Sequence, residues 1–227
     1  MKKLLILTLF VLSQLTFSAS AELGVNIGVS AQVGTAEASG SESENSSVTN
    51  SETEELLYGT GSFFIEKTLG FLPGPLGRLT IGYDHVPHDI GTGTATNTRQ
   101  DLGAKANAGK QETMENNVSA NFENLNTLYL TLRVTDWLYL KAGTLTVDAI
   151  SQESLQTGSS YGNADLDGTM YGFGINQSTD NGMFFRVEYN VMDIDGVTLT
   201  STTNSDNTVT LDGIDTTSAR ASIGKSF

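Results

Sequence analysis

The sequence predicts an all-β protein, an eight-stranded antiparallel up-and-down transmembrane β-barrel. Three observations lead to this prediction. Apolar residues alternate with small polar ones along most of the chain, the segments between these runs are long and short in turn, and the last run reaches Phe227. A period of two is the period of a β-strand. A closed barrel explains a strand at the very end of the chain, because the last strand must pair with the first to leave no edge in a membrane.

The first 21 residues read as a secretory signal peptide. Met1–Lys3 is a short basic segment, an apolar run extends from Leu4 to Leu12, and Ala19–Ala21 matches a cleavage site. The apolar run is too short for a transmembrane helix, which needs about 20 residues. We therefore expect a signal peptide at 1–21 and a β-barrel domain at 22–227. Since no apolar helical span follows, the mature chain can cross a membrane only as a barrel.

Eight alternating runs follow, each of roughly 9–13 residues, the length at which a tilted strand crosses a bilayer. The expected strands are Leu23–Gly34, Leu56–Thr68, Arg78–Val86, Phe122–Val134, Trp137–Val147, Gly168–Gln177, Met183–Met192 and Leu211–Phe227.

The first strand has apolar residues at every odd position from Leu23 to Val33, and Gly or small polar residues between them. The second ends at a Gly-Pro-rich segment, 69–77, and the third ends at Pro87, because both residue types interrupt strands. The fourth carries leucine at every second position from Leu128 to Leu132. These runs therefore each present one apolar face and one polar face.

The fifth strand has apolar residues on both faces, so its parity is ambiguous. We place Leu138, Leu140 and Ala142 outward, because this turns Lys141 inward. The sixth and seventh strands are joined by a turn that contains Asn-Gly, a hairpin signal. The eighth strand places Arg220 on its polar face.

The connections alternate in length as an outer-membrane barrel requires, with short turns on the periplasmic side and long loops outside. The long connections are Ala36–Glu55, Pro87–Asn121, Asp148–Asp167 and Asp193–Thr210, and the short ones are Leu69–Gly77, Thr135–Asp136 and Ser178–Gly182. The polar faces hold mainly Gly, Ser and Thr, whereas a face turned to water is normally rich in Lys and Glu. We therefore expect the polar faces to line a narrow lumen.

The charge and the residue usage exclude several classes of protein. Without Lys2 and Lys3, 10 Lys and Arg stand against 26 Asp and Glu, a net charge of −16. This balance argues against nucleic-acid binding, which needs a basic face. The chain contains no cysteine, so we expect neither disulfides nor a lipid anchor on a cysteine.

The chain resembles the small eight-stranded outer-membrane barrel proteins of Gram-negative bacteria, the superfamily of the OmpA transmembrane domain, OmpX and OmpW. The signal peptide, the alternating strands and the closing segment Ala219–Phe227 carry the resemblance. It implies residence in the outer membrane, contact with lipid and lipopolysaccharide, and a role for Phe227 in the signal read by the barrel-assembly machinery. Lys225 departs from the family pattern, which has an apolar residue two positions before the end.

Seven charged residues fall on the expected inner faces of the strands. They are Glu66, Arg78, Asp84, Arg133, Arg186, Glu188 and Arg220. Buried charges need partners, and an eight-stranded barrel is just wide enough for side chains to fill it. We expect a salt-bridged network that plugs the lumen. The alternative is an ion pathway through the same residues.

Other polar and aromatic residues have less specific interpretations. His85 and His88 lie near Pro87 at a strand end, where we favour solvated side chains over metal binding or catalysis. The first long loop is acidic, and we expect it to be mobile and solvated. Four aromatic residues are candidates for the girdles at the membrane interfaces: Trp137, Tyr139, Tyr171 and Tyr189.

The sequence thus predicts an outer-membrane barrel without enzymatic chemistry, cofactor or metal, and with no role in nucleic-acid binding. No Gly-x-Ser-x-Gly or His-Glu-x-x-His motif occurs. We expect a structural or surface-interaction role, in which a plugged barrel presents acidic loops to an extracellular partner. The alternative is a narrow, porin-like or OmpW-like channel for small or apolar solutes.

Overall fold

The computed structural model describes residues 24–44, 47–102, 111–155 and 159–227. The expected signal peptide, 1–21, lies outside these ranges. The described chain forms one antiparallel sheet of ten strands and a short 3-10 helix, η1 (Gly74–Arg78). The strands are β1 (Val25–Glu44), β2 (Ser47–Thr68), β3 (Leu79–His85), β4 (Ile90–Gly91), β5 (Ala95–Leu102), β6 (Gln111–Arg133), β7 (Leu138–Ser154), β8 (Ala164–Ser178), β9 (Met183–Thr200) and β10 (Thr208–Ser226).

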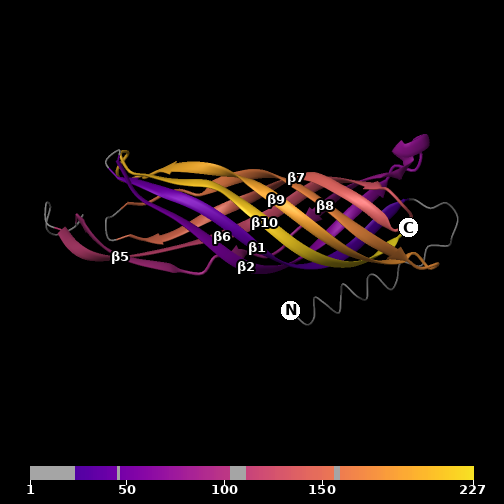
Figure 1. Cartoon of the computed structure of the whole chain (residues 1–227), viewed down its shortest axis with the longest axis horizontal. Coiled ribbons are helices and arrows are strands. Elements are labelled where there is room, and N and C mark those ends of the chain that lie inside the picture. Colours follow the sequence, from indigo (N-terminus) through magenta and orange to yellow (C-terminus); the bar gives the residue numbers. More distant parts are fainter. Residues whose placement is uncertain (1–23, 45–46, 103–110, 156–158) are drawn as a thin grey trace.

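The sheet closes on itself into a barrel. β10 pairs with β1 from Asn26 opposite Ser226 onward, and β3 joins β2 to β6. Because β3, β4 and β5 all pair with β6, they share one position in the ring, which therefore has eight positions. The prediction that the last strand pairs with the first is confirmed. Figure 1 shows the strands tilted around the long axis of the molecule, with the C-terminus at the same end as η1.

Two different ends result from the connections. We call the end with η1 and the turns 134–137 and 179–182 the turn end, and the opposite end the far end. At the turn end, the turn that contains Gly182 contacts the last strand directly. Ser226 N–H donates a hydrogen bond to Gly182 O at 2.8 Å. Gly182 has a φ of +82°, a conformation that residues with a side chain rarely adopt.

The prediction of four long loops is wrong, because the strands continue through most of these segments. β1 and β2 extend to Glu44 and from Ser47, so the expected mobile loop Ala36–Glu55 is mainly a paired hairpin. β7, β8, β9 and β10 lengthen in the same way, and Pro87–Asn121 contains β4, β5 and the start of β6. Cross-strand hydrogen bonding overrides the polar composition here, since Ser and Thr in these segments are compatible with strands.

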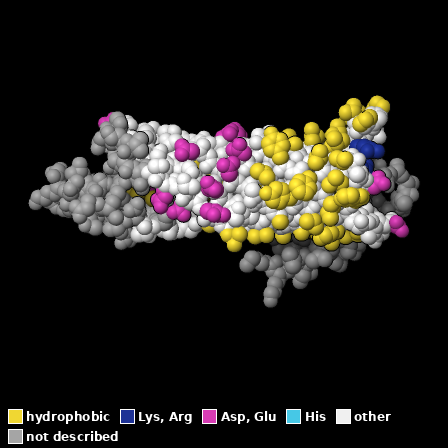
Figure 2. Space-filling model, in the orientation of Figure 1, with side chains coloured by type: hydrophobic (Ala, Val, Ile, Leu, Met, Phe, Trp, Pro, Cys, Tyr) yellow, Lys and Arg dark blue, Asp and Glu magenta, His cyan; other side chains and the backbone are white. Residues whose placement is uncertain are grey.

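The outer surface carries an apolar belt around the half of the barrel next to the turn end (Figure 2). Its exposed members include Phe63, Ile65, Ile81, Leu128, Leu130, Leu132, Leu140, Tyr171, Phe173, Ile175, Phe185, Val187, Tyr189 and Ile223. The prediction that Lys141 points into the barrel is confirmed, because Leu140 is exposed on the outer surface and Lys141 is buried. A surface that is apolar outside and polar inside is that of a transmembrane barrel.

Beyond the belt the outer surface becomes acidic (Figure 2). We call this zone the acidic collar, defined by the exposed residues Glu37, Glu55, Asp165, Asp167, Asp193, Asp195 and Asp215. The strands keep their parity while the chemistry of both faces inverts. On β9 the outward residue changes from Val191 to Asp193, while the inward residue changes from Asn190 to Met192.

The inside of the barrel at the collar is accordingly an apolar core. Its buried members are Val86, Leu125, Tyr129, Leu145, Val147, Leu166, Met170, Met192, Ile194 and Ile214. A barrel that is apolar inside and charged outside suits water rather than lipid. The collar therefore has the surface chemistry of a water-exposed barrel and not that of a lipid-facing one. Among the described residues, no helix is both long and apolar enough to cross a membrane.

Candidate functional site

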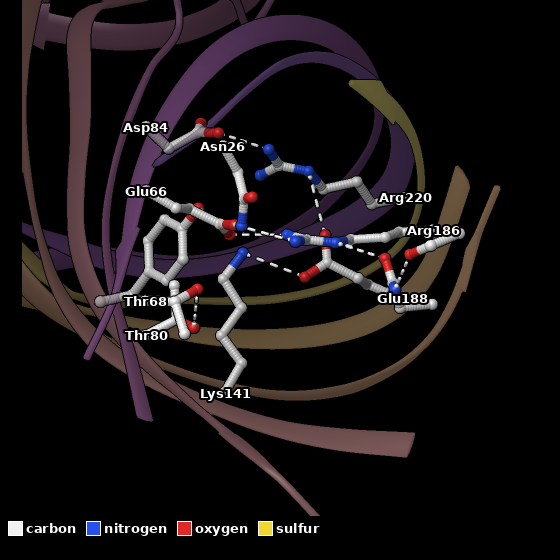
Figure 3. A network of polar contacts seen from close by, with 12 residues as sticks. Asn26, Glu66, Thr68, Thr80, Asp84, Lys141, Arg186, Glu188 and Arg220 are labelled. Carbon is white, nitrogen blue, oxygen red and sulfur yellow. Dashed lines mark hydrogen bonds and ion pairs between the residues drawn. The ribbon is translucent and has the colours of Figure 1, made fainter. Parts of the chain in front are cut away.

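The most distinctive site is a network of charges that crosses the lumen within the apolar belt (Figure 3). Glu66 of β2 is its first centre. Arg186 Nη1 donates to Glu66 Oε1 at 2.6 Å and Arg186 Nη2 donates to Oε2 at 2.8 Å. Asn26 Nδ2 and the Tyr129 hydroxyl each donate to the same carboxylate at 2.9 Å. Four charge-assisted hydrogen bonds thus hold one buried carboxylate.

Glu188 of β9 is the second centre of the network. Its Oε1 lies 3.2 Å from Lys141 Nζ, and its Oε2 lies 3.2 Å from Arg220 Nε. Arg220 Nη2 also donates to Asp84 Oδ2, which accepts a further bond from Ser62 Oγ at 3.0 Å. Each centre therefore links strands that lie apart in the ring.

The network balances its charges. Three carboxylates (Glu66, Asp84 and Glu188) face three cations (Lys141, Arg186 and Arg220), and all six side chains are at most 13% exposed. Buried charges are tolerated when they are paired and hydrogen-bonded. The neutral total means that the lumen needs no bound ion to compensate it.

Aromatic rings complete the packing around the cations. Lys141 Nζ lies 4.1 Å from the centre of the Tyr129 ring, and the Arg186 guanidinium lies 4.4 Å from the centre of the Phe184 ring. Both distances allow a cation–π attraction. These rings therefore pack against the cations of the network inside the barrel.

Strand parity and register explain why these residues meet. Asn26 lies opposite Glu66, and Arg220 lies opposite Glu188, so each pair sits on neighbouring strands with side chains on the same face. The contact between Glu66 and Arg186 joins β2 to β9 across the lumen instead. Sequence parity can place a residue inside, but only closure of the barrel brings these two together.

Two of the seven residues predicted for the network lie elsewhere. Arg78 and Arg133 are exposed at the turn end, and Arg78 Nη1 donates to Val134 O at 3.4 Å. Arg78 ends η1 and precedes β3, so strand parity does not apply to it, and Arg133 is the last residue of β6, where the side chain is exposed at the rim of the barrel. The other five meet inside, joined by Lys141, Asn26 and Tyr129. The sequence signal for Lys141 was its inward parity.

Of the four aromatic residues predicted for the girdles, three lie on the outer surface and one lies inside the barrel. Trp137, Tyr171 and Tyr189 point outward and are exposed, whereas Tyr139 is 6% exposed and points into the lumen. The girdle prediction for Tyr139 is wrong, because on β7 it alternates with the outward Leu138 and Leu140.

The two histidines do not converge. His85 Nδ1 lies 2.8 Å from Asn126 Oδ1, while His88 Nε2 lies 2.9 Å from Thr60 Oγ1 and accepts the Gly61 N–H at 3.1 Å. Across the described ranges, no group of three or more His, Cys, Asp or Glu residues is placed to hold a metal ion.

A small cavity separates the network from the apolar core. It measures about 20 Å³ and is lined by Gln32, Asp84, Val86, Leu125, Thr127, Met170, Asn190, Met192 and Arg220. Asn190 Oδ1 is buried there without a hydrogen-bond partner in the protein. A cavity of this size accommodates about one water molecule.

Changing Gly82 to alanine should disturb the network without removing any charge. A Cβ at Gly82 would lie 2.4 Å from the Tyr129 ring, whose hydroxyl bonds Glu66. We expect a loss of about 1–3 kcal/mol in the free energy of unfolding, measured by urea titration in lipid vesicles. Gly70→Ala is the matched control, because a Cβ there meets nothing within 4 Å. Equal stabilities of the two variants would contradict the role given to Tyr129.

Comparisons with known proteins reveal similarity in fold and none in sequence family. No protein-family model and no curated protein matches the sequence. Among solved structures, the chain is similar to OprG, an outer membrane protein of Pseudomonas aeruginosa, with 10% identity, a TM-score of 0.46 and coverage of 92% of this chain and 98% of that one. It is also similar to the outer membrane protease OmpT of Escherichia coli, with 7% identity, a TM-score of 0.45 and coverage of 92% and 99%.

A third similar structure is Ail, the attachment invasion locus protein of Yersinia pestis, in complex with the heparin analogue sucrose octasulfate. The identity is 10%, the TM-score is 0.36, and the coverage is 88% of this chain and 99% of that one. With TM-scores below 0.5, these similarities carry no argument about function. The barrel architecture rests on the strand pairing of the chain itself.

Proposed function

We propose that this protein is a sealed outer-membrane barrel that anchors an acidic, water-exposed β-sheet surface for interaction with extracellular partners. The observation that carries the proposal is the change of the outer surface from the apolar belt to the acidic collar, together with the opposite change inside the barrel. In this proposal the apolar belt and the charge network belong to a membrane half, and the acidic collar with its apolar core belongs to a water-exposed half. We assign it no catalytic role.

The sealed lumen is supported by two successive barriers. The charge network crosses the lumen within the belt, and the buried apolar residues around Leu145 and Met170 pack inside the barrel at the collar. An ion crossing the barrel would have to break paired charges and then pass an apolar core, and each step is costly. This favours the anchor over the narrow channel.

The proposed location implies its own partners. We propose outer-membrane lipid and lipopolysaccharide around the belt, and the barrel-assembly machinery during biogenesis. Phe227 is the proposed assembly signal, and its position supports such a role, because its N–H donates to Val25 O at 2.8 Å and so completes the pairing of the last strand with the first.

Recordings of the purified protein in a planar lipid bilayer test the sealed lumen. We expect no stable, reproducible conductance steps, because no water-filled path crosses the charge network. An open porin recorded in the same bilayers is the positive control. Reproducible steps from the wild-type protein would overturn the sealed barrel and favour the channel.

A further inference from the structure

At the far end of the barrel, β2 is not paired with β4 or β5 in the described residues, and we call this gap the seam. β2 pairs with β1 along almost its whole length, from Ser47 to Lys67, but it pairs with β3 only from Phe63 to Thr68. Within the described ranges, β4 and β5 on the other side of the seam pair only with β6. In the part of the chain that the structure describes, no strand therefore pairs with the edge of β2 from Ser47 to Ser62. In Figure 1, β5 and the hairpin of β1 and β2 lie apart at this end.

His88 marks the base of the seam and reveals how the edge is oriented. It accepts the N–H of Gly61, the first residue of β2 beyond the pairing with β3 on this edge. Backbone N–H groups on one edge of a strand recur every second residue. The N–H groups of Thr53, Glu55, Leu57 and Gly59 therefore face the seam, while those of the intervening residues face β1.

The other place where two extended strands part is closed by the chain itself. β8 and β9 pair only up to Gly168 opposite Ile194. Beyond that point, Thr202 N–H and Thr202 Oγ1 donate to Ser160 O at 2.8 and 3.1 Å. Among the described residues between His88 and the far end, no comparable hydrogen bond crosses the seam beside β2. The two gaps are therefore not equivalent, and among the described strands the free edge is that of β2.

Exposed strand edges are often protected by proline, by a bulge or by charged side chains, lysine above all. Between Ser51 and Gly61, β2 has no proline or lysine, its charged residues are Glu52, Glu54 and Glu55, and its register irregularity with β1 lies nearer the tip, opposite Glu42 and Ser43. Side chains on both faces are exposed from Ser51 to Glu55. An added strand could therefore form backbone hydrogen bonds along this edge without displacing a side chain.

The negative charge around this edge of β2 favours a basic binding partner. No Lys or Arg occurs from Gly24 to Ser62, whereas this stretch holds Glu37, Glu42, Glu44, Glu52, Glu54 and Glu55. Across the strands, Glu55 lies opposite Glu37, Glu37 opposite Asp215, and Asp215 opposite Asp193. A second copy of the chain pairing by the same edge would bring glutamates against glutamates, and like charges placed opposite each other are destabilising.

We propose that the free edge of β2 from Ser51 to Gly61 binds an extended, basic segment of a partner protein as an additional β-strand. Backbone hydrogen bonds would supply affinity, as in other cases of strand addition. The surrounding carboxylates would attract and select a basic segment. This inference rests on the proposed surface-interaction function and names the class of partner for it.

The test uses the full barrel and a short fluorescent peptide of alternating Lys and Thr. The double variant Thr53→Pro with Leu57→Pro removes two N–H donors that face the seam and leaves the pairing with β1 intact, since proline is tolerated on the free side of an edge strand. Thr53→Ala with Leu57→Ala is the matched control. We expect roughly tenfold weaker binding of the peptide to the proline variant than to this control.

Two further comparisons separate the possible outcomes. The same peptide N-methylated at alternate residues, and its Glu-for-Lys counterpart, should both bind at least about tenfold more weakly to the wild type. Equal binding to the proline and alanine variants, both shown to be folded by a heat-dependent shift in gel mobility, would overturn strand addition. If Glu52→Gln with Glu54→Gln and Glu55→Gln then abolished that binding, the acidic surface would still support the proposed function. Absence of any binding to the wild type would also overturn the inference, whereas the sealed lumen is tested separately by conductance.

Discussion

Replacing Glu66 with alanine should lower the free energy of unfolding by about 3–5 kcal/mol. The substitution removes the carboxylate that accepts hydrogen bonds from Arg186 Nη1 and Nη2, and it leaves the Arg186 cation without this partner inside the lumen. It also leaves Asn26 Nδ2 and the Tyr129 hydroxyl without their acceptor. Urea unfolding of the protein in lipid vesicles, followed by tryptophan fluorescence from Trp137, measures the change.

The matched control is Arg133→Ala, which removes a charge at an exposed strand end. We expect this variant to remain within about 0.5 kcal/mol of the wild type. A second comparison isolates the ion pair. Glu66→Gln combined with Arg186→Met removes both charges and should recover much of the lost stability, because breaking a buried pair is costlier than replacing both partners. If Glu66→Ala were as stable as Arg133→Ala, the network would not be the structural plug described here.

Placing a charge on the lipid-facing belt is the second large effect. Leu130 lies between the outward leucines Leu128 and Leu132 and is 47% exposed on the outer surface. Leu130→Arg should lower the free energy of unfolding in lipid vesicles by about 2–4 kcal/mol, because arginine near the middle of a bilayer is poorly solvated. The measurement is the same urea titration.

Thr146→Arg is its control, since Thr146 is also outward on the barrel but lies opposite Asp167, where the acidic collar begins. We expect a cost of only about 0–1 kcal/mol at this position. Equal costs at Leu130 and Thr146 would place the membrane boundary elsewhere. A larger cost at Thr146 would invert the assignment of the membrane half and the water-exposed half.

The fold class could be predicted from the sequence because parity is a local property. The alternation from Leu23 to Val33 and the leucines from Leu128 to Leu132 indicate faces without reference to any other strand. The inward orientation of Lys141 follows from the same rule. Where two faces are both apolar or both exposed, the rule is less informative, and the predictions for Tyr139 and Arg133 were wrong in those places.

The lengths of the strands could not be read from local composition. The segment Ala36–Glu55 is polar and acidic, which is typical of a loop, yet its described residues, 36–44 and 47–55, lie in the paired strands β1 and β2, and β1 pairs with β10 as well. The inversion of chemistry around Met192 and Asp193 was visible in the sequence, but its meaning was not. It indicates a boundary between lipid and water only once both residues are placed on one barrel.

By itself, then, the sequence determined the strand period, the pairing of the last strand with the first, and the inward orientation of most of the charges in the network. Only the tertiary structure decided which charges meet, because Glu66 and Arg186 are 120 residues apart and lie on strands that face each other only in the closed ring. It also decided where the ring remains open beside β2, since pairing depends on how far each neighbouring strand extends. Both outcomes depend on contacts between distant segments, which no local pattern records.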